Sequence, residues 1–140
     1  MTRICWPAAA DGRYRIDIAL GTVPSRLMVD TGLVDPQGQV AFEIEPALFD
    51  LLEQSGQLLV AGLRSRFDSS GRHVSLKVGF VMARLLDPAT GSPIGPTARC
   101  LAFRGSPGVP SRVGVVFFHL LTGCRADWNF DHRLWCVECP

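Results

Sequence analysis

Asp30, Thr31 and Gly32 directly follow an apolar run, Leu27 to Val29, and are the residues of this chain best suited to chemistry. A run of this kind predicts a buried strand, which places the carboxylate of Asp30 at the end of that strand. A carboxylate in such a place is unfavourable unless other groups satisfy it. Two interpretations follow: an ordinary turn in which Asp30 bonds its own backbone, or an aspartate held there for acid–base catalysis.

The cysteines are the second group that could do chemistry: Cys5, Cys100, Cys124, Cys136 and Cys139. Cys136 and Cys139 form a single C-x-x-C motif just after His132, and Cys5 or Cys124 would complete a zinc site. A second paired motif is missing and the neighbouring residues favour a strand, so we expect plain thiols, no metal and no cofactor. An odd number of cysteines without a secretion signal also argues against a disulfide framework.

The histidines and tryptophans are expected to be structural. His73, His119 and His132 have no Ser or Cys partner in a nucleophile motif. His119 lies in an apolar stretch, which favours a core or interface histidine. Trp6, Trp128 and Trp135 are expected in the core or at a dimer interface rather than in a ligand cage.

Length and charge limit the classes of function. The 140 residues suit one domain, 1–140, and 47% apolar with 19% charged residues indicates a globular chain. A net charge of +1 gives no reason to expect nucleic acid or an anionic membrane as a partner. No segment approaches the ~20 apolar residues of a membrane helix. The first residues lack a signal-peptide hydrophobic region, so a cytoplasmic location is expected, although a domain cut from a longer protein would look the same.

Strands are predicted on both sides of the Asp-Thr-Gly stretch. Apolar residues alternate with polar ones from Tyr14 to Leu20, which is typical of a half-buried strand. The segment from Gly21 to Ser25 is predicted as a turn, and a second strand runs from about Arg26 into Asp30. Alternation resumes at Val40, Phe42 and Ile44. The pattern therefore predicts a hairpin that ends at Asp30, then a loop and a third strand.

The rest of the chain is predicted to be mainly β. A helix opens at Pro46 and closes near Gly56, with Leu48, Leu51 and Leu52 on one face. The remaining elements are strands over 58–67, 72–86, 99–103, 127–130 and 134–137, a turn at 68–71, irregular connections at 87–97 and 105–111, and a short helix that ends near 123. We expect a small closed barrel with one clear helix and one short C-terminal helix.

These elements resemble the retropepsin-like aspartic protease family. The resemblance rests on "RLMVDTG", on the strand and helix in "VAFEIEPALFDLLEQSG", and on the glycine-tipped hairpin "RSRFDSSGRHVSL". Near the end, "VGVVFFHLLTGCRADWNF" is similar to the family's second signature. The resemblance covers about residues 13 to 138. It implies the small closed barrel of that family.

The resemblance implies an aspartic endopeptidase that acts as a homodimer on peptide or protein substrates. The chain has one Asp-Thr-Gly, so Asp30 from each chain would meet across a two-fold axis and share a proton. Thr31 would hydrogen-bond across to the partner chain, and Gly32 would let the backbone approach the two carboxylates. No metal or organic cofactor is needed. The implied substrate-binding residues lie in the loop after Asp30, the hairpin flap of about 64–73 and the second signature: Leu33, Arg66, Phe67, Asp68, Gly71, Val113 and Gly114.

Some residues depart from the family pattern. Leu33 stands where the family usually has Ala or Ser, and the segment after it, "VDPQGQ", looks like an insertion beside the site. Asp35, one turn away, is a candidate to disturb the proton of the two catalytic aspartates. The alternative is therefore an inactive domain of the same fold that serves for dimerisation or peptide binding.

Overall fold

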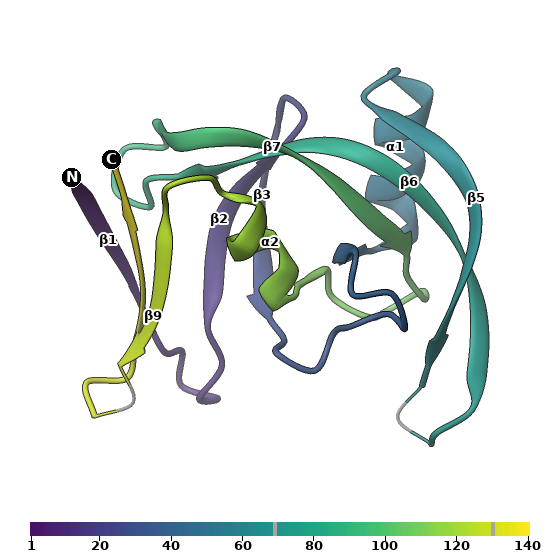
Figure 1. Ribbon diagram of the computed structural model, residues 1–140, viewed down its shortest axis with the longest axis horizontal. Helices are drawn as coiled ribbons and strands as arrows, with labels where there is room; N and C mark the ends of the chain where they lie inside the picture. Colours follow the sequence, from purple (N-terminus) through teal and green to yellow (C-terminus); the bar gives the residue numbers. More distant parts are fainter. Residues whose placement is uncertain (69, 130) are drawn as a thin grey trace.

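The computed structural model describes residues 1–68, 70–129 and 131–140, and strands dominate this part of the chain (Figure 1). In chain order the strands are β1 (Thr2–Pro7), β2 (Arg15–Leu20), β3 (Val23–Val29), β4 (Val40–Ile44), β5 (Leu58–Phe67), β6 (His73–Leu86), β7 (Pro93–Arg104), β8 (Arg112–Val113), β9 (Arg125–Asn129) and β10 (Leu134–Cys139). The helices of the described part are α1 (Pro46–Gln54) and α2 (Val115–Leu120). The prediction of a mainly β chain with one clear and one short helix is confirmed.

A seven-stranded sheet forms the body of the described chain. Its order is β2-β3-β8-β4-β7-β6-β5, and a further pairing of β2 with β6 closes the sheet into a ring. Most neighbours are antiparallel, but β3 with β8 and β4 with β7 are parallel. Strand β5 lies outside the ring and pairs with β6. The ring is the small closed barrel that the alternation predicts.

The barrel core comes from alternate residues of its strands. In β2, Ile16, Ile18 and Leu20 are fully buried, while the residues between them are only half-buried. Strand β4 differs, because all five of its residues are buried, Glu43 included. The sequence predicts only Val40, Phe42 and Ile44 on an inward face. Because β4 is covered on both faces, that prediction is incomplete, and a charged side chain is carried into the interior.

The β5–β6 hairpin forms a long curved arm on the side of the molecule away from the termini (Figure 1). It closes at the predicted turn, where the Gly71 amide donates to the carbonyl of Asp68 at 3.0 Å. Gly71 has φ 81°, a conformation that suits glycine. Ser69 of this turn lies outside the described residues, as does Phe130 of the predicted strand 127–130.

The structure corrects several predicted boundaries. Strand β3 already begins at Val23, so the turn predicted over 21–25 is shorter than expected. Strand β7 begins at Pro93, inside the connection predicted to be irregular over 87–97, because Pro93 pairs with Leu86 at the end of β6. Leu51, predicted on the buried face of α1, is 52% exposed, and Phe49 faces the core instead.

The chain ends meet in a separate three-stranded sheet with the order β1-β10-β9. Strand β1 has no counterpart in the prediction. Two disulfides tie this sheet: Cys5–Cys136, between residues directly opposite each other on β1 and β10, and Cys124–Cys139. The prediction of plain thiols is therefore wrong. Cys136 and Cys139 are three residues apart on one strand, so they point to opposite faces and bond to different partners.

The remaining cysteine, Cys100, is free and buried, and burial raises the pKa of its thiol to about 12. Among the described residues, no group of three or more His, Cys, Asp or Glu side chains is placed to hold a metal ion. No helix in the described chain has the length and apolar character to cross a membrane. Because disulfides persist in oxidising compartments, the bonded cysteines weigh against the cytoplasmic location, which stays a prediction.

Candidate functional site

The end of β3 fixes the backbone of Asp30. Strand β3 pairs with β8 in parallel register, with Val29 beside Val113. The Asp30 amide donates to the carbonyl of Val113 at 2.9 Å, and the Leu33 amide donates back to the carbonyl of Asp30 at 3.1 Å. Asp30 therefore begins a tight turn whose position is set by two strands far apart in the sequence.

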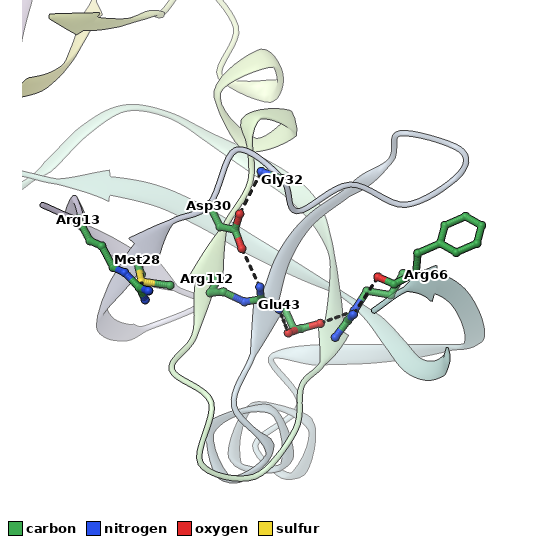
Figure 2. Close-up of polar contacts among 8 residues, drawn as sticks. Arg13, Met28, Asp30, Gly32, Glu43, Arg66 and Arg112 are labelled. Atoms are coloured by element: carbon green, nitrogen blue, oxygen red, sulfur yellow. Dashed lines mark hydrogen bonds and ion pairs between the residues drawn. The ribbon is translucent and has the colours of Figure 1, made fainter. Parts of the chain in front are cut away.

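The Asp30 carboxylate has a bonding partner on each of its oxygens (Figure 2). Oδ1 accepts a hydrogen bond from the Gly32 amide at 3.0 Å, which is the Asx-turn of the simpler interpretation. Oδ2 accepts from Nη1 of Arg112 at 2.6 Å. A Cβ added at Gly32 would lie only 3.3 Å from Oδ1, so glycine leaves space for this close approach. The carboxylate is still 28% exposed.

Arg112 connects Asp30 to a chain of alternating charges. Its Nη2 donates to Oε2 of Glu43, and Nε of Arg66 donates to Oε1 of the same carboxylate at 2.6 Å (Figure 2). Burial opposes the charge on Arg112, but hydrogen bonds and charge attraction from Glu43 and Asp30 outweigh it, so the pKa of the guanidinium is raised. The ion pairs join the Asp30 loop, β8, β4 and the β5–β6 hairpin.

A cleft of about 240 Å³ lies over this cluster. The lining residues are Asp30, Gly32, Leu33, Val34, Arg66, Phe67, Asp68 and Arg112. The floor comes from the Asp30 loop and β8, and the β5–β6 hairpin supplies the other wall. An apolar and charged lining of this size suits part of an extended peptide rather than a large organic ligand.

Most of the predicted substrate-binding residues meet in this cleft. Leu33, Arg66, Phe67 and Asp68 line it together with Asp30. Gly71 is at the hairpin tip and is not among the lining residues. The assignment of these five residues to substrate binding stays a prediction.

Val113 and Gly114 lie beneath the Asp30 loop rather than in the cleft. Val113 is fully buried. A Cβ added at Gly114 would come within 2.5 Å of the Leu33 carbonyl oxygen, so only glycine allows the loop to pack this closely. The two residues therefore position the loop from below.

Thr31 is not among the residues that line the cleft with Asp30. It is exposed and lines a larger hollow of about 560 Å³ together with residues of α2 and β9, among them His119 and Trp128. His119 is exposed, so a core position is wrong for it. Trp6 and Trp135 are buried, whereas Trp128 is 52% exposed. The predicted bond from Thr31 to a partner chain is not tested by a single chain.

Asp35 has a structural task in the loop after Asp30. Its Oδ1 accepts from the amides of Gln39 and Val40 at 2.7 and 2.8 Å, and Oδ2 lies 3.5 Å from Nη1 of Arg64. Burial raises the pKa of this carboxyl, but the backbone amides outweigh it, and the net pKa is lowered. The carboxylate therefore stabilises the fold of its own loop, and Asp35 is not among the residues that line the cleft.

Sequence reasoning missed Arg112 and Glu43. Arg112 lies directly before the Val113–Gly114 pair of the second signature, and its side chain reaches Asp30 across 82 positions of sequence. Glu43 stands alone among apolar residues of β4, which is a detectable sign of a buried, paired carboxylate. Neither signal identifies the partner, since pairing depends on the order of strands in the sheet.

The comparisons with known proteins concern the fold. No protein-family model matches the chain, and no curated protein matches it either. The crystal structure of a retropepsin-like aspartic protease from Rickettsia conorii superimposes with a TM-score of 0.61 at 18% sequence identity. The match covers 99% of this chain and 91% of that chain. The chain therefore has the retropepsin-like fold, and the predicted fold class is confirmed.

Proposed function

We propose that this chain is an aspartic endopeptidase that works as a homodimer and cuts extended peptide segments. The observation that carries the proposal is the place of the Asp30 carboxylate. It stands at the end of a barrel strand, next to Gly32, in a cleft walled by a long hairpin, within a retropepsin-like fold. Hydrolysis of a peptide bond needs a general base and a general acid at the same moment, which one carboxylate cannot supply. A second Asp30 from an identical chain meets that need.

In this mechanism the two carboxylates share one proton. The ionised Asp30 takes a proton from water, and the protonated Asp30 of the partner subunit gives its proton to the carbonyl oxygen of the substrate. The water oxygen bonds to the carbonyl carbon and forms a tetrahedral diol. The Asp30 that took the proton from water then gives it to the amide nitrogen as the C–N bond breaks. A hydroxyl of the diol gives its proton to the other Asp30, so that a carboxylic acid and an amine leave and the two aspartates again share one proton.

The β5–β6 hairpin has the position of a flap in this proposal. Arg66, Phe67 and Asp68 of the hairpin face the Asp30 loop across the cleft. A peptide between them would lie extended, with alternate side chains directed to opposite walls. Closure of the hairpin would exclude water and strengthen the electrostatic interactions at the reacting bond.

The decisive experiment compares wild type with Asp30→Asn on a peptide library between about pH 4 and pH 7. Asp87→Asn, in the turn between β6 and β7, is the matched control. We expect cleavage by wild type and Asp87→Asn, none by Asp30→Asn, and inhibition by a transition-state-mimicking aspartic protease inhibitor. Activity should also fall faster than linearly on dilution, because only the dimer holds both carboxylates. Unchanged cleavage by Asp30→Asn would reject the proposal.

A second candidate function is peptide binding without turnover. The observation that favours it is the engagement of both Asp30 oxygens, one by Gly32 and one by Arg112, within a single chain. This alternative predicts that peptide binds wild type and Asp30→Asn equally well, and that neither variant cleaves it.

A further inference from the structure

The ion pairs of Arg66 and Arg112 with Glu43 and Asp30 hold more positive charge than an active pair of aspartates would balance. Arg66 and Arg112 both donate to the single carboxylate of Glu43, and Arg112 also donates to Asp30 (Figure 2). In one chain the two guanidiniums thus face two carboxylates. When two chains share one proton between their Asp30 side chains, one of these negative charges disappears. Four guanidiniums then face three carboxylate charges.

Glu43 cannot change its position when the Asp30 side chains lose a negative charge. It lies on β4 between β7 and β8, with Arg112 as its register partner on β8, and its side chain is 3% exposed. Its two oxygens are taken by the two arginines. Glu43 therefore fixes both guanidiniums at the wall of the cleft, whatever the charge state of Asp30.

The other charged groups around the cleft are already paired. The Asp68 carboxylate accepts hydrogen bonds from Ser70 and from the amide of Arg72, and lies 3.7 Å from the Arg72 guanidinium. Arg64 pairs with Asp35. Each of these pairs is neutral in sum, and although Asp68 also attracts Arg66, the positive excess of the cluster of Arg66, Glu43 and Arg112 stays the same.

Only the contact between Nη1 of Arg112 and Asp30 has to break, because Nη2 stays on Glu43. In the proposed mechanism an Asp30 oxygen must contact water or substrate, yet Arg112 occupies Oδ2. A substrate carboxylate that accepts from Nη1 would free Oδ2 of Asp30 for water or substrate, and Glu43 would keep Nη2.

We propose that Arg112 is a specificity-determining residue that binds an acidic side chain of the substrate, Asp or Glu, beside the bond to be cut. The incoming carboxylate takes Nη1 of Arg112 in place of Asp30, while Glu43 keeps Nη2, and it restores the charge balance of the Arg66–Glu43–Arg112 cluster. The substrate class is thus an extended peptide with an acidic residue next to the scissile bond. This inference rests on the proposed endopeptidase function.

The test uses peptide pairs that differ only by Glu or Gln at the positions that flank the scissile bond. Wild type is compared with Arg112→Gln, and with Arg99→Gln, whose arginine stacks on Phe80 outside the cleft. At about pH 5.5, where Glu is ionised, we expect wild type and Arg99→Gln to favour the Glu peptide by about tenfold or more in kcat/KM. Arg112→Gln should lose this preference, which is measured as the ratio of kcat/KM for the Glu and Gln peptides and not as an absolute rate. The wild-type preference should also fade below about pH 4, as the substrate Glu takes up a proton.

A binding measurement separates this inference from the proposed activity. The same Glu and Gln pair is made with a reduced, uncleavable bond and titrated calorimetrically into each variant. A Glu preference that depends on Arg112, with no cleavage by any variant, would support the acidic subsite and reject the endopeptidase. Equal binding of both peptides by wild type would overturn the subsite even if cleavage occurs. If Arg112→Gln does not fold, Arg112→Lys replaces it, and a preference reduced by the loss of the planar fork is the expected result.

Discussion

The terminal sheet and the β5–β6 hairpin lie on opposite sides of the Asp30 loop and are held by different forces (Figure 1). Strands β1, β10 and β9 are tied by two disulfides around the buried side chains of Trp135 and Val137. The hairpin instead carries exposed apolar side chains, such as Leu59 and Leu63, and is joined to the rest of the cleft by ion pairs. The terminal sheet is therefore fixed covalently, whereas the hairpin wall of the cleft is held to the Asp30 loop and to β4 by ion pairs.

The largest effect is expected from removal of the Cys5–Cys136 disulfide. This bond spans 131 positions, and the entropy of so long a loop in the unfolded chain predicts a loss of about 5 kcal/mol in the free energy of unfolding. The double variant Cys5→Ser/Cys136→Ser, measured by urea denaturation, tests this value. The matched variant Cys124→Ser/Cys139→Ser opens a span of 15 and should lose less, about 3 kcal/mol. A larger loss for the shorter span would refute the entropic explanation.

A smaller but more local effect is expected from Glu43→Gln. The change leaves Arg66 and Arg112 without their shared anion in a site that is largely closed to water, which should lower the free energy of unfolding by about 3 kcal/mol. Hydrogen exchange should accelerate most in the β5–β6 hairpin, with little change in the terminal sheet. Glu53→Gln, which breaks the half-exposed pair with Lys77, is the control and should change stability by less than about 1 kcal/mol. Equal acceleration in both regions would show that the hairpin is not held by this cluster.

Local patterns predicted the elements that depend on neighbours in sequence. The predicted limits of β5, Leu58–Phe67, agree with the structure, and so does the turn predicted at Gly71. Strand β1 was not predicted, because its pairing partner β10 lies at the other end of the chain. The disulfides were missed for the same reason, since they depend on that pairing.

The site follows the same rule. Asp30 is visible as a carboxylate after an apolar run, but Arg112 reaches it only through the parallel pairing of β3 with β8. Glu43 is visible as an isolated charge in β4, yet its two arginines come from β5 and β8. Residue types therefore predicted the candidate catalytic carboxylate, and the order of strands determined its electrostatic environment.

Asp35 offers a pH-dependent test of the contact between the hairpin and the Asp30 loop. Its native pKa is lowered, so the native state releases this proton more readily than the unfolded chain does. The stabilisation is fully present above the ordinary aspartate pKa of about 4 and is lost as the pH falls through the lowered native pKa.

Asp35→Asn should therefore lower stability by about 1–2 kcal/mol at pH 7, and the difference from wild type should shrink in acid. Urea denaturation from about pH 7 down to pH 3 measures both quantities. A difference that grows in acid would mean that Asp35 does not act as the ionised acceptor of the Gln39 and Val40 amides.

The smallest change is expected from Leu63→Ser on the outer face of the hairpin. Leu63 is 70% exposed, so the free energy of unfolding should change by no more than about 0.5 kcal/mol. The matched change in the terminal sheet is Val137→Ser. Val137 is only 3% exposed, so the buried hydroxyl should lower the free energy of unfolding by about 2–3 kcal/mol. If Leu63→Ser instead destabilised the chain as much as Val137→Ser, the outer face of β5 would have to be covered in solution. Sedimentation of wild type and Leu63→Ser would then show whether a second copy of the chain covers it, because a long apolar edge strand pairs readily with another strand.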